Sequence, residues 1–257
     1  MPLLSIEQLQ VEFGGIRAVN QVSLSLEAGE IRGLIGPNGA GKTSIINAIT
    51  GMVPTRAGRV LFENRDITSF APHDVSRCGV GRTFQHAEIF PDDSVLDNVR
   101  IGVDHHSQVG FLQAAFGLPA ARKAESETRS IAIGLLEAFA LAPWHGQRAG
   151  DLPFGLLKRL DIARAFATRP KLLLLDEPTS GMSEAESKLV VDQIVALSRQ
   201  YGTALMVIEH NMRVIMQLAE RITVLQSGMV LFEGTPAEVQ SNHKVIDAYL
   251  GEEMTDA

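Results

Sequence analysis

The sequence predicts an α/β fold, because short apolar strands alternate with helices over most of its length. An apolar strand at 31–35 leads into a glycine-rich loop at 36–43 and a helix at 44–49. A second apolar run, at 172–175, ends in two carboxylates. Continuous apolar runs of this length are typical of parallel strands that are buried on both faces.

The composition suits one large globular core with a subdomain. The chain has 257 residues, of which 45% are hydrophobic and 21% charged, and its net charge is −7. Without a dense run of Lys and Arg, nucleic acid is a poor candidate as the main partner. No apolar run approaches the roughly 20 residues of a membrane helix, so we expect any membrane role to depend on partners. The single cysteine, Cys78, rules out an internal disulfide.

The N-terminal part predicts antiparallel strands. Residues 6–13 and 22–26 alternate between apolar and polar side chains, and Gly14-Gly15 marks a turn between them. Residues 58–68 predict a further strand that ends in a turn.

The loop at 36–43 has two glycines five residues apart, followed by Lys42 and Thr43. Glycines let several backbone N–H groups point at one anion, Lys42 adds positive charge, and Thr43 offers a hydroxyl to Mg²⁺. A chain of this length matches the pattern by chance about once in a hundred cases. The flanking strand and helix favour a real phosphate site. The nucleotide-binding candidates here are Gly36, Pro37, Asn38, Gly39, Ala40, Gly41, Lys42, Thr43 and Ser44.

From 87 to 160 the strand signals disappear, which predicts a helical subdomain inserted into the core. Residues 125–141 have Ile131, Leu135 and Phe139 at helical spacing. His105-His106 has no cysteine or carboxylate at a ligand spacing, so we expect an exposed loop there and no metal site.

After 171 the α/β alternation returns. Residues 183–186 form a predicted capping box that opens a helix with Val190, Ile194 and Leu197 on one face. A strand at 203–208 follows. Two further strands, 222–225 and 229–232, flank a hairpin turn at 226–228.

Several polar residues sit where parallel strands end, which is the edge of a sheet where ligands bind. Asp176 is the candidate Mg²⁺ ligand and Glu177 the candidate base that polarises the attacking water. The alternative for this pair is an acidic turn. His210 and Gln85 are candidates for contact with the terminal phosphate, with Gln85 also near Mg²⁺. A single histidine after a strand is more often structural, and Gln85 alone is uninformative.

The order of these features resembles the ATP-binding subunits of ABC transporters over essentially the whole chain. The resemblance implies a RecA-like nucleotide-binding core at 1–86 and 161–257, the helical subdomain at 87–160 and a C-terminal extension at 235–257. It also implies roles for individual residues. Phe13 stacks on adenine, although an aromatic residue in a strand is more often part of the core. The resemblance makes 36–44 the Walker A loop, Gln85 the Q-loop glutamine, 152–156 with Phe154 and Gly155 the signature, Asp176 the Walker B aspartate, Glu177 the catalytic base, 180–183 the D-loop and His210 the switch histidine.

The resemblance further implies the cofactors and partners. In this family two ATPase subunits sandwich two ATP molecules, and hydrolysis with Mg²⁺ drives membrane subunits. We therefore expect a second ATPase subunit, as a heterodimer or a homodimer, two multi-span permeases and, indirectly, an extracytoplasmic solute-binding protein. The surface near Gln85 and the helical region after it should grip a short helix of the permease. The expected location is the cytoplasmic face of the membrane.

Five segments resemble the corresponding segments of the branched-chain amino-acid importers: 13–15, 82–86, 209–212, 234–236 and 245–251. Related systems import urea, short amides or aromatic acids. Two other classes stay open: a soluble ABC ATPase in nucleic-acid or ribosome work, and a nucleotide-binding regulator without turnover. The lack of a basic patch, a coiled coil and a second ATPase copy counts against the former. Intact Glu177 and His210 count against the latter.

The chain departs from the family pattern in two places. Pro153 and Leu156 replace the usual serine and glutamine of the signature, and Ser183 replaces the D-loop aspartate. Proline has neither a hydroxyl nor an N–H to donate, although it suits the first turn of a helix. Our hypothesis is a full Walker site with a weakened signature offered to the partner. The alternative is that the helix dipole suffices and the change is neutral.

Overall fold

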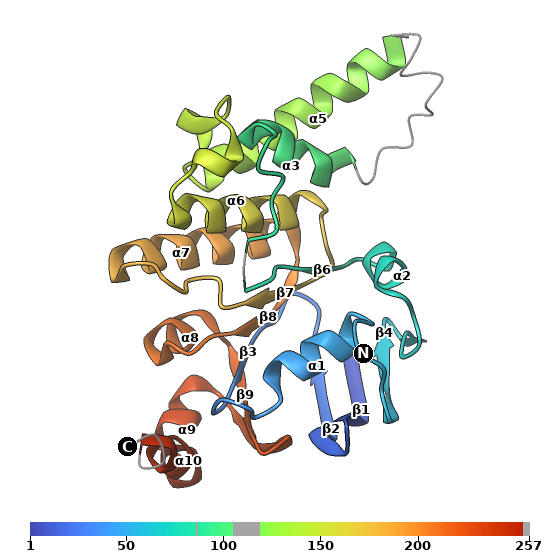
Figure 1. Cartoon of the computed structure of the whole chain (residues 1–257), viewed down its shortest axis with the longest axis vertical. Coiled ribbons are helices and arrows are strands. Elements are labelled where there is room, and N and C mark those ends of the chain that lie inside the picture. The colour runs from blue at the N-terminus through green and yellow to red at the C-terminus, as the bar shows by residue number, and fades with distance from the viewer. Residues whose placement is uncertain (86, 105–118, 254–257) are drawn as a thin grey trace. The chain divides into compact units, whose positions relative to one another are not determined.

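The computed structural model describes residues 1–85, 87–104 and 119–253 (Figure 1), so His86 and the His105-His106 pair lie outside the described residues. The chain forms two compact units. The first comprises Met1–Arg82, Lys171–Pro178 and Ser198–Ala257, and the second comprises Thr83–Pro170 and Thr179–Leu197. Within the described residues, no helix combines the length and hydrophobicity needed to cross a bilayer.

A six-stranded sheet forms the centre of the first unit, in the order β10-β9-β3-β8-β7-β6. The strands from β9 to β6 are parallel, and β10 pairs antiparallel with β9 at the edge. Every residue of β3, β7 and β8 is buried, as their apolar runs predicted. The bounds are β3 (Ile31–Ile35), β6 (Val80–Arg82), β7 (Leu172–Asp176), β8 (Ala204–Ile208), β9 (Arg221–Gln226) and β10 (Met229–Gly234).

A second, antiparallel sheet confirms the prediction for the N-terminal part. Its order is β2-β1-β4-β5, and β1 turns into β2 through Gly14-Gly15. The bounds are β1 (Leu4–Phe13), β2 (Ile16–Leu26), β4 (Ala57–Phe62) and β5 (Arg65–Asp66).

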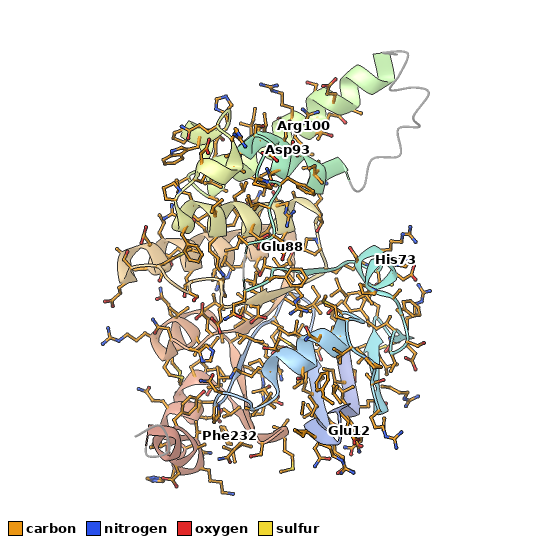
Figure 2. All side chains as sticks on the ribbon, viewed as in Figure 1. Glu12, His73, Glu88, Asp93, Arg100 and Phe232 are labelled. Carbon is orange, nitrogen blue, oxygen red and sulfur yellow. The ribbon has the colours of Figure 1, made fainter. Side chains whose placement is uncertain are left out.

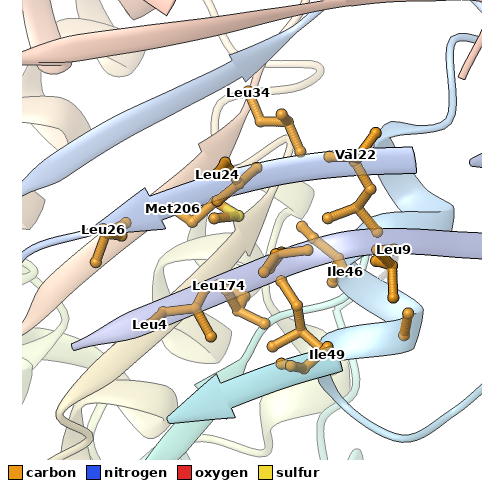
Figure 3. Packing of buried hydrophobic residues seen from close by; sticks show 14 of the residues in the cluster. Leu4, Leu9, Val22, Leu24, Leu26, Leu34, Ile46, Ile49, Leu174 and Met206 are labelled. Atoms are coloured by element: carbon orange, nitrogen blue, oxygen red, sulfur yellow. The ribbon is translucent and has the colours of Figure 1, made fainter. Parts of the chain in front are cut away.

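The hydrophobic core of the first unit joins both sheets to α1 (Lys42–Ile49). In Figure 3, side chains of β1 and β2 lie over Ile46 and Ile49 of α1, with Leu174 and Met206 of the parallel sheet nearby. Ile46 and Ile49 are fully buried. Full burial of an aliphatic side chain contributes about 1.5–3 kcal/mol, so this packing fixes α1 and the loop before it.

The other helices of the first unit are short and have clear end signals. α8 (Met212–Leu218) is capped by the side chain of Asn211, and α9 (Pro236–Ser241) begins with a full capping box of Thr235 and Glu238. The remaining two are α2 (Pro72–Arg77) and α10 (His243–Glu253).

The second unit is helical, as predicted. Its elements are α3 (Val95–Asp104), α5 (Pro119–Ala138), η1 (Ala142–Trp144), η2 (Ala149–Asp151), α6 (Phe154–Ala167) and the first part of α7 (Glu184–Tyr201). Asn98, fully buried, bonds to both main-chain groups of Phe90 and holds the segment before α3, where Figure 2 labels Glu88 and Asp93.

Two details of this unit differ from the expected element bounds. The helix predicted at 125–141 is longer at its start and ends at Ala138, because Ala140 adopts a left-handed φ of 55° that stops it. Phe139 is still buried just beyond the helix end. The expected domain limit at 160 falls inside α6, and the second unit also includes Thr179–Leu197.

Candidate functional site

The candidate residues of the first unit gather at one edge of the parallel sheet. β3 ends at the glycine loop, β7 ends at Asp176, and β8 ends just before Glu209 and His210. Since these strands are parallel and adjacent, with Asp176 opposite Ile208, their carboxyl ends meet. This is the edge where open α/β sheets bind ligands.

The glycine loop turns sharply at its first residue. Gly36 has a φ of 149°, and a Cβ there would lie 2.2 Å from the carbonyl oxygen of Leu225 on β9. Only glycine fits this position. Beyond it, Asn38 and Gly39 are exposed, while Ala40 is buried. The loop therefore rests against β9 and turns its middle residues outward.

Positive charge is concentrated at the same loop. Lys42 is buried, and its ammonium donates hydrogen bonds to the carbonyls of Gly36 at 2.6 Å and Pro37 at 2.8 Å. α1 begins at Lys42, with Gly41 as its N-cap and no side chain capping it. A helix N-terminus carries partial positive charge on its free N–H groups. Loop, lysine and helix thus fit a polyphosphate, with the exposed Thr43 and half-buried Ser44 beside it.

Asp176 is held by an arginine that the sequence analysis missed as a site residue. The guanidinium of Arg82, at the end of β6, lies 3.5 Å from Oδ2 of Asp176, and both side chains are only 8% exposed. Arg82 also donates to Oδ1 of Asn47 on α1 at 2.6 Å. Burial lowers the pKa of Arg82, while the charge of Asp176 acts in the opposite direction. No local signal in the sequence marks this pair, because it depends on which strand lies beside β7.

Glu177 and His210 face each other across two strand ends. Nε2 of His210 lies 2.8 Å from Oε1 of Glu177, whose side chain is 15% exposed. The backbone of Glu177 has a left-handed φ of 49°, and its N–H donates to the carbonyl of Ile208 at 2.9 Å. The pair provides a carboxylate and an imidazole at the same edge as the phosphate loop.

Phe13 is on the surface and is not a core residue. It ends β1 at the hairpin tip, is 47% exposed, and pairs with Ile16, which is 74% exposed. Phe13 therefore presents an aromatic ring at the surface, the kind of group on which a base can stack.

The other candidate residues lie in the second unit. Gln85 is exposed, and its main-chain carbonyl accepts a hydrogen bond from the ammonium of Lys158, a buried residue of α6. Phe154 and Gly155 are the first two residues of α6. Pro153 was expected in the first turn of a helix, and it is instead the N-cap of α6. Its extended ψ of 150° and its fixed φ suit that position.

The predicted capping box at 183–186 is present. The hydroxyl of Ser183 lies 2.7 Å from Oε2 of Glu186, and the backbone N–H of Ser183 donates to the same oxygen at 3.0 Å. Ser183, at the expected D-loop aspartate position, therefore caps α7. These hydrogen bonds lower the pKa of Glu186.

Comparisons with known proteins agree with this site. The family described as "ABC transporter" matches residues 19–180, and the family described as "Branched-chain amino acid ATP-binding cassette transporter" matches 229–255. The high-affinity branched-chain amino acid transport ATP-binding protein LivG of Salmonella typhimurium is 38% identical over 251 residues, covering 98% of both chains. BraF of Pseudomonas aeruginosa, with the same description, is 36% identical with the same coverage.

Solved structures extend the likeness to the fold. The crystal structure of the ADP conformation of an ATP-binding cassette of an ABC transporter has a TM-score of 0.83 and 31% identity, covering 98% of this chain and 99% of that one. A nucleotide-free ATP-binding cassette from an ABC transporter has a TM-score of 0.82, also at 31% identity, covering 97% and 99%.

Proposed function

This chain belongs to the ABC transporter family and is a P-loop ATPase, and from this we propose that it is the ATP-hydrolysing subunit of an importer for branched-chain or related amino acids. The observation that carries the ATPase assignment is the meeting of the phosphate loop, Asp176, Glu177 and His210 at one sheet edge. The similarity to branched-chain transport proteins over 98% of the chain supports the cargo class.

In this proposal the loop residues and Lys42 bind the phosphates of ATP, and Phe13 contacts the adenine. Glu177 accepts a proton from the attacking water, and His210 holds the carboxylate of Glu177 in one orientation. The imidazole also offers a polar group to the terminal phosphate. A base already oriented before the reaction loses little entropy in the transition state.

Mg²⁺ is the metal that this donor set suits, because hydroxyl, carboxylate and amide oxygens are its preferred ligands. Thr43, Asp176 and Gln85 are the residues that would hold it. When bound, it would neutralise charge that develops on the phosphoryl oxygens. Arg82 lies 3.5 Å from Asp176 and holds its carboxylate in place at the end of β7.

We propose a second, non-identical ATPase subunit as the partner, with a homodimer as the other outcome. Phe154 and Gly155 would offer backbone N–H groups at the positive end of α6 to the nucleotide of this partner. Pro153 adds no hydroxyl there, and Ser183 is engaged in capping α7. In a heterodimer the two ATP sites would then differ.

ATPase subunits of importers work with membrane permeases, and we propose two multi-span permeases near Gln85, at the cytoplasmic face of the membrane. A solute-binding protein would deliver the cargo. The test is to affinity-purify the chain from detergent-solubilised membranes of its native cell and identify the proteins that accompany it. Two permeases and a second ATPase are expected; soluble proteins, ribosomes or nucleic acid alone would contradict the proposal.

The cargo is tested in proteoliposomes that contain the purified complex and its binding protein. Uptake of leucine, isoleucine and valine is measured against urea, acetamide and benzoate, with ATP inside the vesicles. A complex with Glu177→Gln is the matched control, since it should assemble fully and transport nothing. Uptake of urea, amides or aromatic acids instead of branched-chain amino acids would move the assignment to a related importer.

A further inference from the structure

The hairpin turn after β9 reaches the phosphate loop, although it follows that loop by almost two hundred residues. β9 runs parallel to β3, and Val224 lies opposite Ile35. The carboxyl end of β9 is therefore at the same edge as Gly36. The turn itself, at 227–228, has two consecutive residues with left-handed φ angles, 49° for Ser227 and 77° for Gly228.

The backbone of Gly228 bonds to two different segments. Its N–H donates to the carbonyl of Ala40 in the phosphate loop at 3.1 Å. Its carbonyl accepts from the N–H of Asn20 on β2 at 2.8 Å. One residue thus links the phosphate loop to the antiparallel sheet whose hairpin ends in Phe13.

The packing at this junction leaves no room for a side chain. A Cβ on Gly228 would lie 2.9 Å from the carbonyl oxygen of Ala18 and 3.4 Å from Cα of Val19. A Cβ on Gly41 would lie 2.4 Å from the same oxygen of Ala18 and 3.6 Å from Cα of Gly228. The contacts at this junction are between main-chain atoms, which cannot move aside as a flexible side chain can.

We infer that Gly228 is a positioning residue for nucleotide binding: it fixes the phosphate loop relative to the hairpin of Phe13. The inference rests on the nucleotide site proposed above. Phosphates and base of one nucleotide would contact two different sheets, so the spacing between those sheets sets how well both ends fit at once. Preorganised spacing favours binding because less freedom is lost when the ligand binds.

The first experiment compares Gly228→Ala with Gly29→Ala by calorimetric titration of ADP and of pyrophosphate. Gly29 is the matched control because it has a φ of 74°, close to that of Gly228, and no atom lies within 4 Å of a Cβ there. Both variants bear similar backbone strain, and only Gly228→Ala meets other main-chain atoms.

We expect Gly228→Ala to bind ADP at least about tenfold more weakly than Gly29→Ala, which is a rise of one power of ten in Kd. The loss should be larger for ADP than for pyrophosphate, which lacks the base. A general folding defect would instead lower the fraction of molecules that bind and leave their Kd unchanged. Equal Kd values in the two variants, or equal losses for both ligands, would overturn the inference. Wild type that fails to bind ADP would overturn the nucleotide site itself.

If Gly228→Ala does not fold, hydrogen exchange of the wild type decides. Bound ADP should slow exchange at the amides of Asn20 and Gly228 together with those of 36–44. Protection of 36–44 with unchanged exchange at Asn20 and Gly228 would show that the junction does not respond to the nucleotide and would overturn the inference.

Discussion

His210 and Glu177 form a pair at 2.8 Å between the ends of two neighbouring parallel strands. Glu177 holds this position with a left-handed backbone, a conformation that costs on the order of 1–3 kcal/mol and is found at functional sites. The bond from its N–H to Ile208 supports that conformation. The position of the carboxylate is therefore set by the carbonyl of Ile208, the last residue of β8, and by His210, two residues beyond it.

Glu177→Gln should abolish most hydrolysis while preserving nucleotide binding. The amide is nearly isosteric with the carboxylate but accepts no proton, and a general base contributes about 10²–10⁴-fold. Phosphate release and ADP affinity measure the two effects separately. Hydrolysis at the wild-type rate would show that Glu177 is not the base.

His210→Ala should slow turnover by about 10- to 150-fold, the equivalent of the 1.5–3 kcal/mol of one hydrogen bond to a charged group. His210→Gln should recover part of the rate, because an amide N–H can still donate to Glu177. The pair of variants is compared by kcat at saturating ATP. Equal rates for the Ala and Gln variants would contradict an orienting role.

Pro153→Ser should raise ATP turnover of the assembled transporter by about tenfold if one new hydroxyl bond to a charged phosphate forms at the partner's site. Pro153→Ala is the control, since it removes the ring without adding a hydroxyl. Turnover and ATP affinity are measured on the complex. No difference between the Ser and Ala variants would support the neutral alternative, in which the dipole of α6 suffices.

Arg82→Met should lower the free energy of unfolding by about 3–5 kcal/mol, because it removes the cation that lies 3.5 Å from the buried carboxylate of Asp176. The double variant with Asp176→Asn should lose less than the two single losses combined. Urea denaturation measures all three variants.

A matched control for that cycle is the exposed pair of Arg59 and Glu7, whose N–O distance is 2.7 Å. Arg59→Met should cost only about 0–1 kcal/mol. Equal losses of unfolding free energy in Arg59→Met and Arg82→Met would show that burial does not determine how much these ion pairs stabilise the fold.

Asp161 should make stability fall as pH rises. Burial raises its pKa to about 6, against the opposing charges of Arg164 and Lys158, while exposed Glu88 raises it further. The folded state then binds a proton that the unfolded chain releases near pH 4, so stability is highest below that value and is lost between about pH 4 and 6. The shift corresponds to about 3 kcal/mol.

Asp161→Asn removes this titration, so its unfolding free energy should decline less between pH 4 and 7 than that of wild type. Asp151→Asn, at an exposed residue, is the control. Urea titrations at several pH values give the slopes. Identical slopes for wild type and Asp161→Asn would mean that the pKa of Asp161 is not raised.

Local patterns predicted the elements that depend on local causes. The strand before Gly36, the helix that ends at Ile49 and the capping box of Ser183 are each specified within a few residues, and the structure confirms them. Parallel strands place their carboxyl ends at one edge of the sheet, so it was predictable that Asp176, Glu177 and His210 would lie at the same edge. The roles of Gln85, Phe154, Gly155 and every other candidate site residue stay predictions.

Contacts between distant segments were not predictable in the same way. The pairing of Arg82 with Asp176 depends on β6 lying beside β7, and strand order leaves no local trace in the sequence. The bonds of Gly228 to Ala40 and Asn20 depend on β9 lying beside β3. The pattern of alternating strands and helices in one sequence indicates that the strands are parallel. It does not indicate which strand lies beside which in the sheet.

The order of strands has a consequence for how the chain is made. β3, which leads into the phosphate loop, pairs with β8 and β9, and these strands begin at Ala204 and Arg221. At about 5–20 residues per second, a ribosome needs on the order of 10–40 s to synthesise them after β3. During that interval β3 has no partner strand on either side. The nascent chain therefore acquires nucleotide binding only near the end of translation, and ribosome stalling before Arg221 would expose a β3 edge open to aggregation or to chaperones.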